Sequence, residues 1–268
     1  MIFSCFPMAE SFKGKGLPLD QAGMDEALNL LDIDGASVWS VISVETSGVG
    51  FLSDRRPKIL FERHVFSRLT KGKYDESHPD ISNPQPGGYG PSGAHQYERL
   101  WDAMALDHDA ALMSSSWGLG QVMGFNFQAA GFAGVEEMVS AMKDSEGDQL
   151  MAMMRFVKNM GLDGPLREKD WQAFARGYNG QEYAEKEYDR KLESFHDNYS
   201  RDGLPDLDVR AAQLYLVYLG YDPGPIDGLL GSRTLSALNQ FLEKEGRQPS
   251  DSVTQDMLDL LSSRAGDI

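Results

Sequence analysis

The sequence predicts a predominantly helical α+β fold for the larger part of the chain, followed by a small C-terminal module of three helices. Apolar residues recur at three- and four-residue spacing along most of the chain, as they do on the buried face of a helix. A short strand-like run after Pro57 supplies the β-element. A polar stretch with Gly and Pro over 198–206 separates two periodic regions. We therefore expect two domains, 1–200 and 206–268.

Capping residues and apolar spacing predict the helices of the larger domain. Asp20 is a suitable N-cap for a helix over 20–31, and a second helix over 36–44 is expected to stop before Gly48 and Gly50. Four prolines and four glycines predict an irregular loop over 75–93. Apolar periodicity predicts further helices over 95–112, 134–144, 147–160, 168–178 and 181–195.

The C-terminal module is expected to contain three short helices. Apolar residues keep helical spacing from Val209 to Leu219, where Gly220 ends the helix. A turn rich in Pro and Gly follows at 222–225. Further helices are predicted over 232–245 and 254–261.

Composition excludes several classes of protein. The 268 residues include 25 Lys and Arg against 41 Asp and Glu, a net charge of -16. This acidity argues against nucleic acid and against a basic membrane-surface binder, since both need clustered cations. The single cysteine, Cys5, cannot form an intramolecular disulfide. The first residues lack a basic segment and a long apolar segment, so we expect no signal peptide and no membrane span.

Glu45 is the first candidate catalytic residue. It follows Val38, Val41 and Ile42 at helical spacing, so its carboxylate ends a stripe that should face the core. Burial favours the protonated form of a carboxyl group, and a protonated carboxyl is what a general acid needs to protonate a glycosidic oxygen. The alternative is a glutamate at a helix C-terminus that reaches water.

Glu62 is the second candidate carboxylate. In an alternating strand it would share one face with Leu60 and His64. It could act as a base on water. It could equally form a structural ion pair with a nearby arginine, for which the candidates are Arg55, Arg56 and Arg63.

Two further segments are candidates for ligand binding. Residues 116–121 form a glycine-bearing turn with no strand expected before it, in which glycines would let the backbone approach a ligand and Gln121 would offer an uncharged donor and acceptor. Tyr178 and Asn179 lie where the apolar face of a predicted helix meets its end at Gly180. A core tyrosine followed by an Asn-Gly cap is the alternative.

No metal or cofactor site is predicted. The five histidines lack the spacing of a zinc motif. Residues 32–35 begin like a calcium loop but lack the glutamate that closes one. The Met-rich run is expected to be helix core, and its members are Met151, Met153, Met154 and Met160.

Taken together, the segments from about Gly16 to Tyr199 resemble the muramidase domain of some phage endolysins and related bacterial cell-wall hydrolases. The most specific part is 44–51 followed by 56–66, and 116–126 and 178–180 complete it. A Glu that closes a helix, a Gly-Leu-x-Gln turn and a Tyr-Asn pair, in this order, are similar to goose-type lysozymes and lytic transglycosylases. The resemblance implies a lysozyme-like catalytic domain.

The C-terminal module resembles a peptidoglycan-binding domain of the three-helix type. The resemblance rests mainly on Leu219-Gly220-Tyr221, on the segment 224–228 and on Phe241. The chain departs from the family pattern at Leu242, where a glutamine is common.

These resemblances imply a monomeric, cofactor-independent enzyme that cleaves the β-1,4 bond between N-acetylmuramic acid and N-acetylglucosamine in bacterial peptidoglycan. They assign Glu45 as the catalytic acid, and Gln121, Tyr178 and Asn179 as substrate-binding residues. Glu62 would activate water or stabilise the oxocarbenium-like transition state, and a separation of the two carboxylates of roughly 6.5–9.5 Å would favour inversion.

Two other functions remain open at this point. A lytic transglycosylase would keep the acid but use the muramic 6-hydroxyl in place of water, and Glu62 would then need no catalytic role. A non-catalytic wall-binding protein would have no need of Glu45. In each case we expect synthesis in the bacterial cytoplasm, with access to the wall through holin-type release or effector export.

Overall fold

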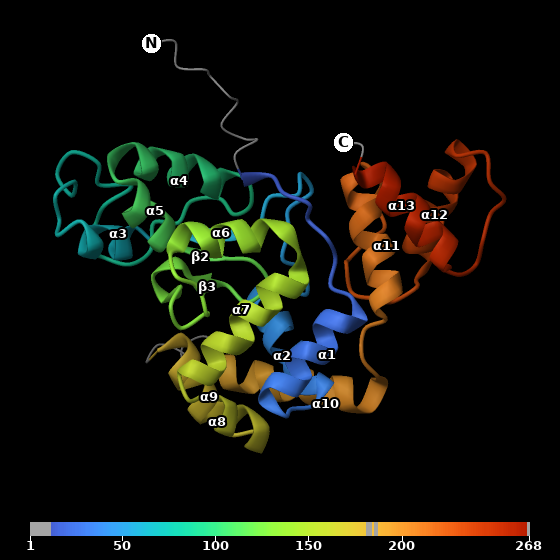
Figure 1. Ribbon diagram of the computed structural model, residues 1–268, viewed down its shortest axis with the longest axis horizontal. Helices are drawn as coiled ribbons and strands as arrows, with labels where there is room; N and C mark the ends of the chain where they lie inside the picture. Colours follow the sequence, from blue (N-terminus) through green and yellow to red (C-terminus); the bar gives the residue numbers. More distant parts are fainter. Residues whose placement is uncertain (1–11, 181–183, 185–186, 267–268) are drawn as a thin grey trace, which may run out of the picture.

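The computed structural model describes residues 12–180, 184 and 187–266 (Figure 1). Helices dominate, and a three-stranded antiparallel sheet in the order β1-β2-β3 is the β-element. The predicted α+β class with a C-terminal helical module is therefore confirmed. Within the described part, no single helix is long and apolar enough to cross a membrane; α1 and α2 pass that test only as a pair bent by 106°. Cys5 and the residues around it lie outside the described ranges.

Two capped helices begin the fold. The Asp20 side chain accepts a hydrogen bond from the Gly23 N–H at the start of α1 (Gln21–Leu31), as predicted. Asp34 does the same for Ser37 in α2 (Gly35–Thr46). The second helix stops before Gly48, as predicted, but it continues two residues past the expected end at 44, and Ser47 in the left-handed conformation ends it in place of a glycine.

The sheet corrects two sequence predictions. Strand β1 (Ile59–Phe61) ends one residue before Glu62, and His64 already lies in α3 (Arg63–Leu69), so these two residues do not continue an alternating strand. β1 pairs with β2 (Ser115–Trp117), and β2 pairs with β3 (Val122–Met123). The glycine-bearing turn therefore connects two strands of a hairpin, although no strand was expected before it.

The remaining helices follow the predicted order with four differences. The helix expected over 95–112 is interrupted at Asp107, whose side chain caps the second segment through the Ala110 N–H. Helix α8 was not predicted. The last of these helices runs to Asp202, past its expected end at 195, so the irregular segment before the next helix is confined to 203–206. Its expected start at 181 lies outside the described residues. Met160 is half-exposed, unlike the rest of the Met-rich run.

The helices are α4 (His95–Leu106), α5 (His108–Met113), α6 (Val135–Asp144), α7 (Glu146–Asn159), α8 (Asp163–Glu168), α9 (Trp171–Asn179) and α10 (Tyr188–Asp202), with a 3-10 turn η2 (Gly124–Asn126) after β3.

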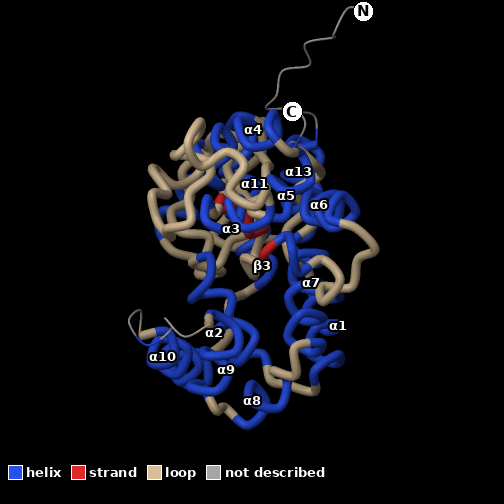
Figure 2. The backbone as a smooth tube through the Cα atoms, turned by 90° about the vertical axis from the view of Figure 1, so that its left-hand side faces the viewer, coloured by secondary structure: helices blue, strands red, loops and turns tan. Residues whose placement is uncertain are grey.

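The core of the larger domain lies around α2 and α7. Val38, Val41 and Ile42 are fully buried, as the helical stripe predicts. Helix α2 packs on α10, and α7 packs on α1. Both views place α3, α4 and α5 at one end of this domain and α8, α9 and α10 at the other, with β3 and α7 between them (Figure 2). The end of α2 contacts the turn between β2 and β3, because the Thr46 hydroxyl donates to the Leu119 carbonyl.

Three helices form the C-terminal module, as predicted: α11 (Leu207–Tyr218), α12 (Ser232–Lys244) and α13 (Gln255–Gly266). Gln213 fixes the loop between the first two, because its Oε1 accepts from the N–H groups of Asp227 and Gly228. Its Nε2 donates to the Thr234 hydroxyl oxygen at the start of α12. Phe51, from the larger domain, joins the apolar core of this module.

Candidate active site

A groove of about 730 Å³ lies between the end of α2, the sheet and helices α9 and α10. The structure brings together on its walls all the side chains that the sequence singles out, which are Glu45, Glu62, Gln121, Tyr178 and Asn179. They come from four distant segments of the chain. Their convergence in one groove is what a composite catalytic site requires.

Glu45 is half-buried in the last turn of α2. The Tyr188 hydroxyl, from the first residue of α10, donates a hydrogen bond to Glu45 Oε1. The next residue, Thr46, fixes the helix end: its hydroxyl donates to the Leu119 carbonyl at 3.1 Å, and its own carbonyl accepts from Lys58 Nζ at 3.0 Å. The carboxylate of Glu45 is thus positioned both directly and through its backbone.

Two neutral tyrosines surround this carboxylate. Burial raises the pKa of Tyr178 well above 10, and the negative charge of Glu45 raises it further. The same two causes, in the same order, raise the pKa of Tyr188, while its hydrogen bond with Asn179 lowers it. The Tyr178 hydroxyl donates to the Gly120 carbonyl at 2.6 Å, which connects α9 to the hairpin turn. Both phenols therefore stay protonated and act as hydrogen-bond donors.

Gln121 closes the hairpin turn while lining the groove. Its Oε1 accepts from the Ser116 hydroxyl at 2.8 Å, and its Nε2 donates to the Gly118 carbonyl at 2.8 Å. The turn glycines serve packing here, which differs from the expected approach of backbone to ligand. A Cβ on Gly118 would lie 2.6 Å from Gln149 Cδ, and one on Gly120 would lie 2.5 Å from Met153 Sδ. Side chains of α7 occupy the space that the glycines leave.

Glu62 stands on the wall formed by the sheet and α3. It occupies the N-cap position of α3, with 15% of its side chain exposed. Its Oε2 lies 3.1 Å from His64 Nδ1. A histidine is thus one neighbour of this carboxylate, while Arg56 pairs with Asp54.

The groove extends past Glu45 in a second direction. A smaller hollow of about 390 Å³ shares Glu45, Leu60 and Gln121 with the larger one and continues to Lys58 and Ser92. On the other side, Arg68 and Lys191 line the larger hollow. A carboxylate that lines both of two adjoining hollows suits a chain-like ligand that is bound on both sides of the reacting bond.

Sequence reasoning missed Tyr188. Its contact with Glu45 spans 143 residues, and the segment before it shows no marked periodicity. The available signal was its place at the start of a helix ten residues after Tyr178, but the helix was predicted to begin at 181.

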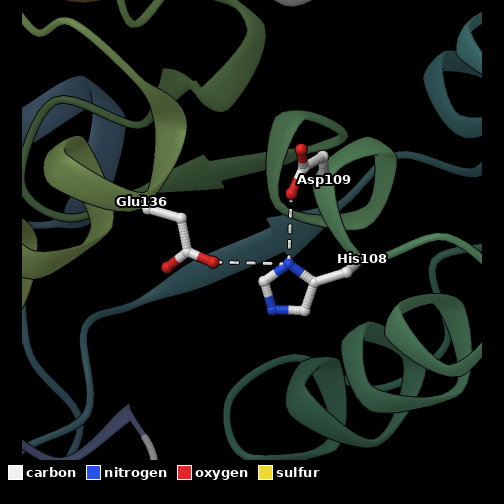
Figure 3. A group of neighbouring side chains, drawn as sticks. All are labelled: His108, Asp109 and Glu136. Carbon is white, nitrogen blue, oxygen red and sulfur yellow. Dashed lines mark hydrogen bonds and ion pairs between the residues drawn. The ribbon is translucent and has the colours of Figure 1, made fainter.

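A separate cluster of potential metal ligands lies outside the groove, at the junction of α5 and α6 (Figure 3). His108 Nδ1 lies 3.2 Å from Asp109 Oδ1 and 3.3 Å from Glu136 Oε1. All three side chains are exposed, and both carboxylates approach the same imidazole nitrogen (Figure 3). The spacing of the histidines did not reveal this cluster, since Glu136 belongs to a different helix.

Comparison with known proteins agrees with this geometry. Residues 34–200 match the family model described as N-acetylmuramidase, and residues 205–261 match the model of a putative peptidoglycan binding domain. The crystal structure of the Burkholderia AP3 phage endolysin is 42% identical, covering 69% of this chain and 71% of its own, with a TM-score of 0.63. Comparison with curated proteins finds no match. The first family model spans more than half of the chain and contains every candidate site residue, so the chain belongs to the N-acetylmuramidase family of glycoside hydrolases and carries a peptidoglycan-binding domain after its catalytic part.

Proposed function

We propose that this muramidase cleaves the β-1,4 bond between N-acetylmuramic acid and N-acetylglucosamine, with Glu45 as the general acid. The observation that carries the proposal is the position of Glu45 where the two hollows adjoin, with a tyrosine hydroxyl donating to its carboxylate. A general acid must lie within hydrogen-bond reach of the oxygen that it protonates, and only a group exposed to the groove meets this condition.

The surrounding residues have distinct roles in this proposal. Tyr188 orients the carboxyl group of Glu45, and Tyr178 fixes the hairpin turn against α9. Asn179 and Gln121 line the saccharide path. Glu62 is the candidate base that activates water on the opposite wall, with His64 Nδ1 3.1 Å from its carboxylate.

Replacement of Glu45 tests the assignment of the acid. Glu45→Gln keeps the shape of the side chain but cannot donate the proton, so we expect release of reducing ends from purified sacculi to fall by about 10²–10⁴-fold. Glu26→Gln changes an exposed carboxylate of α1 that does not line either hollow, so this control should keep full activity. Wild-type activity in Glu45→Gln would refute the assignment.

Product analysis distinguishes hydrolysis from the transglycosylase reaction. Water as nucleophile gives reducing N-acetylmuramic acid ends, whereas attack by the muramic 6-hydroxyl gives 1,6-anhydro ends. We expect reducing ends, and a large loss of rate in Glu62→Gln. Mass spectrometry that found 1,6-anhydro ends, together with an active Glu62→Gln variant, would establish the transglycosylase reaction instead.

We further propose that the enzyme acts on the bacterial cell wall as a monomer, and that the C-terminal module binds peptidoglycan. The resemblance to a phage endolysin and the match to a peptidoglycan-binding family support this proposal. The division of the chain then falls at 203–206, the short break between α10 and α11. Co-sedimentation of the Glu45→Gln protein with sacculi measures the binding without degrading the ligand.

A further inference from the structure

A buried ion pair joins the C-terminal module to the catalytic domain. Arg210 belongs to α11 of the module, and Glu146 is the first residue of α7. Both side chains are completely buried. Two opposite charges in such a position are expensive to desolvate, so the fold must satisfy their hydrogen-bonding groups.

Each guanidinium nitrogen of Arg210 and each carboxylate oxygen of Glu146 makes at least one hydrogen bond. Arg210 Nη2 donates to Glu146 Oε1 at 2.8 Å, and Nη1 donates to Oε2. Glu146 also accepts from the backbone N–H of Leu19 at 3.0 Å and of Gly50 at 2.8 Å. Burial raises the pKa of Glu146, but the charge and hydrogen bonds of Arg210 outweigh this and lower it, so the carboxylate stays ionised.

The same guanidinium holds the loop that leaves the catalytic helix. Arg210 Nε donates to the Gly48 carbonyl at 3.0 Å, and Nη2 donates to it as well. Gly48 lies three residues after Glu45, and Gly50 is held by Glu146. The ion pair therefore fixes this loop at both ends, through one carbonyl and one N–H group.

Other parts of the module cover the same loop. A Cβ on Gly48 would come 3.3 Å from the Ile226 carbonyl, and Phe51 is buried in the core of the module. Lys58, which donates to the Thr46 carbonyl, lies in the field of the pair: burial lowers its pKa, Glu146 raises it and Arg210 lowers it. The backbone that follows Glu45 is thus connected to the module.

We propose that Arg210 is a positioning residue for the muramidase reaction, so that the peptidoglycan-binding module completes the catalytic structure in addition to binding the wall. The proposal rests on the role of Glu45 proposed above. Fold stability alone does not explain the pair, because well-packed apolar residues of similar volume commonly stabilise a buried site as well as an ion pair does. Apolar side chains cannot hold the Gly48 carbonyl and the Gly50 N–H.

This distinction defines the test, made in the full-length chain. The double variant Arg210→Met/Glu146→Leu removes both charges and leaves neither unpaired. We expect its Tm to fall, because the Gly48 carbonyl and the N–H groups of Leu19 and Gly50 lose their partners, but to fall less than in Glu146→Ala, which leaves a charge unpaired. Its co-sedimentation with sacculi should stay close to wild type. Its kcat on soluble, uncrosslinked glycan strands should fall by about 10- to 100-fold with little change in KM, since small misplacements of a reacting group have effects of this size. An unchanged kcat would overturn the proposal.

A second variant covers the case in which the double variant does not fold. Arg210→Lys keeps the buried charge but offers one nitrogen in place of the guanidinium fork, so Glu146 and Gly48 cannot both be bound as they are. We expect the same selective loss of kcat, and wild-type kinetics would overturn the proposal. Arg247→Lys, at an exposed arginine of the same module, is the matched control and should behave as wild type. Glu45→Gln measured in parallel tests the underlying function separately, because its result does not depend on Arg210.

Discussion

The groove around Glu45 and the interface around Glu146 place two carboxylates in contrasting surroundings. Glu45 is half-buried and faces the groove, and the neutral hydroxyl of Tyr188 donates to it. Glu146 is completely buried and receives the guanidinium of Arg210 and two backbone N–H groups. The two sites are nevertheless connected, because the Gly50 N–H in the loop after Glu45 donates a hydrogen bond to Glu146 Oε1.

The difference shows how surroundings decide what a glutamate can do. A phenol can donate to a carboxyl oxygen whether or not the acid carries its proton, so Tyr188 orients Glu45 without preventing proton transfer. A guanidinium stabilises the ionised form, so Arg210 lowers the pKa of Glu146 and favours its carboxylate. The site of Glu45 therefore suits proton transfer, whereas the site of Glu146 suits holding backbone groups in place.

Removing the buried carboxylate of Glu146 should give the largest difference in stability between the two sites. Glu146→Ala leaves Arg210 buried without its counter-charge, so we expect the free energy of unfolding to fall by about 3–5 kcal/mol. Denaturant unfolding at neutral pH measures this. Glu45→Gln, at a half-open site, should stay within about 0.5 kcal/mol of wild type. Comparable stability losses in the two variants would remove the distinction between the sites.

Removing the Tyr188 hydroxyl tests how the carboxylate of Glu45 is held in the groove. Tyr188→Phe keeps the ring but not the donor to Glu45, and hydrogen bonds to charged groups contribute about 1.5–3 kcal/mol, so we expect kcat to fall by about tenfold or more. Tyr199→Phe is the matched control. It removes a hydroxyl from the same helix that bonds to Ser43 of α2 at 2.6 Å, away from the carboxylate. Equal effects of the two changes on kcat would show that only helix packing matters.

The smallest predicted effect concerns the other end of the catalytic helix. Burial raises the pKa of Asp34, but the hydrogen bond from the Ser37 N–H and the interaction with Lys169 outweigh it and lower the pKa to about 2. Because the folded-state pKa lies below the unfolded value, this stabilisation is present above about pH 4 and is lost as the pH falls towards 2.

Asp34→Ala should therefore cost about 1 kcal/mol at pH 7, discounted for a side chain that is nearly half exposed. The difference from wild type should shrink at pH 2, as measured by chemical unfolding at both pH values. A difference that stayed constant with pH would mean that the charge of Asp34 contributes nothing to this cap.

The sequence was informative where one local pattern determined the outcome. The apolar stripe on α2 and the glycines that follow it placed Glu45 correctly at a helix end. The strand prediction failed at Glu62 because the positions of Leu60, Glu62 and His64 fit the alternation of a strand. Glutamate is not a usual N-cap, so the sequence gave no sign that a helix begins at Arg63.

Contacts between distant residues could not be predicted in this way. Tyr188 and Glu45 meet only because α10 packs on α2, and Arg210 and Glu146 meet only because the module packs on the catalytic domain. Arg210 did leave a trace in the sequence, since it is the only charged residue between Asp208 and Asp222. A lone cation among apolar residues of a helix indicates a buried partner but does not identify it.

The break between α10 and α11 spans only 203–206, which allows a reach of roughly 14 Å at full extension. When two domains are joined by a long linker, the catalytic site can reach a wide volume around each point of attachment. When the two domains are fixed to one another, the catalytic site reaches a smaller volume but has a defined orientation. With the module held at Arg210, each anchoring event presents the groove to glycan strands at one set offset and angle. Cleavage would then be spaced by the architecture of the wall itself, and the enzyme would advance by releasing and rebinding as a whole.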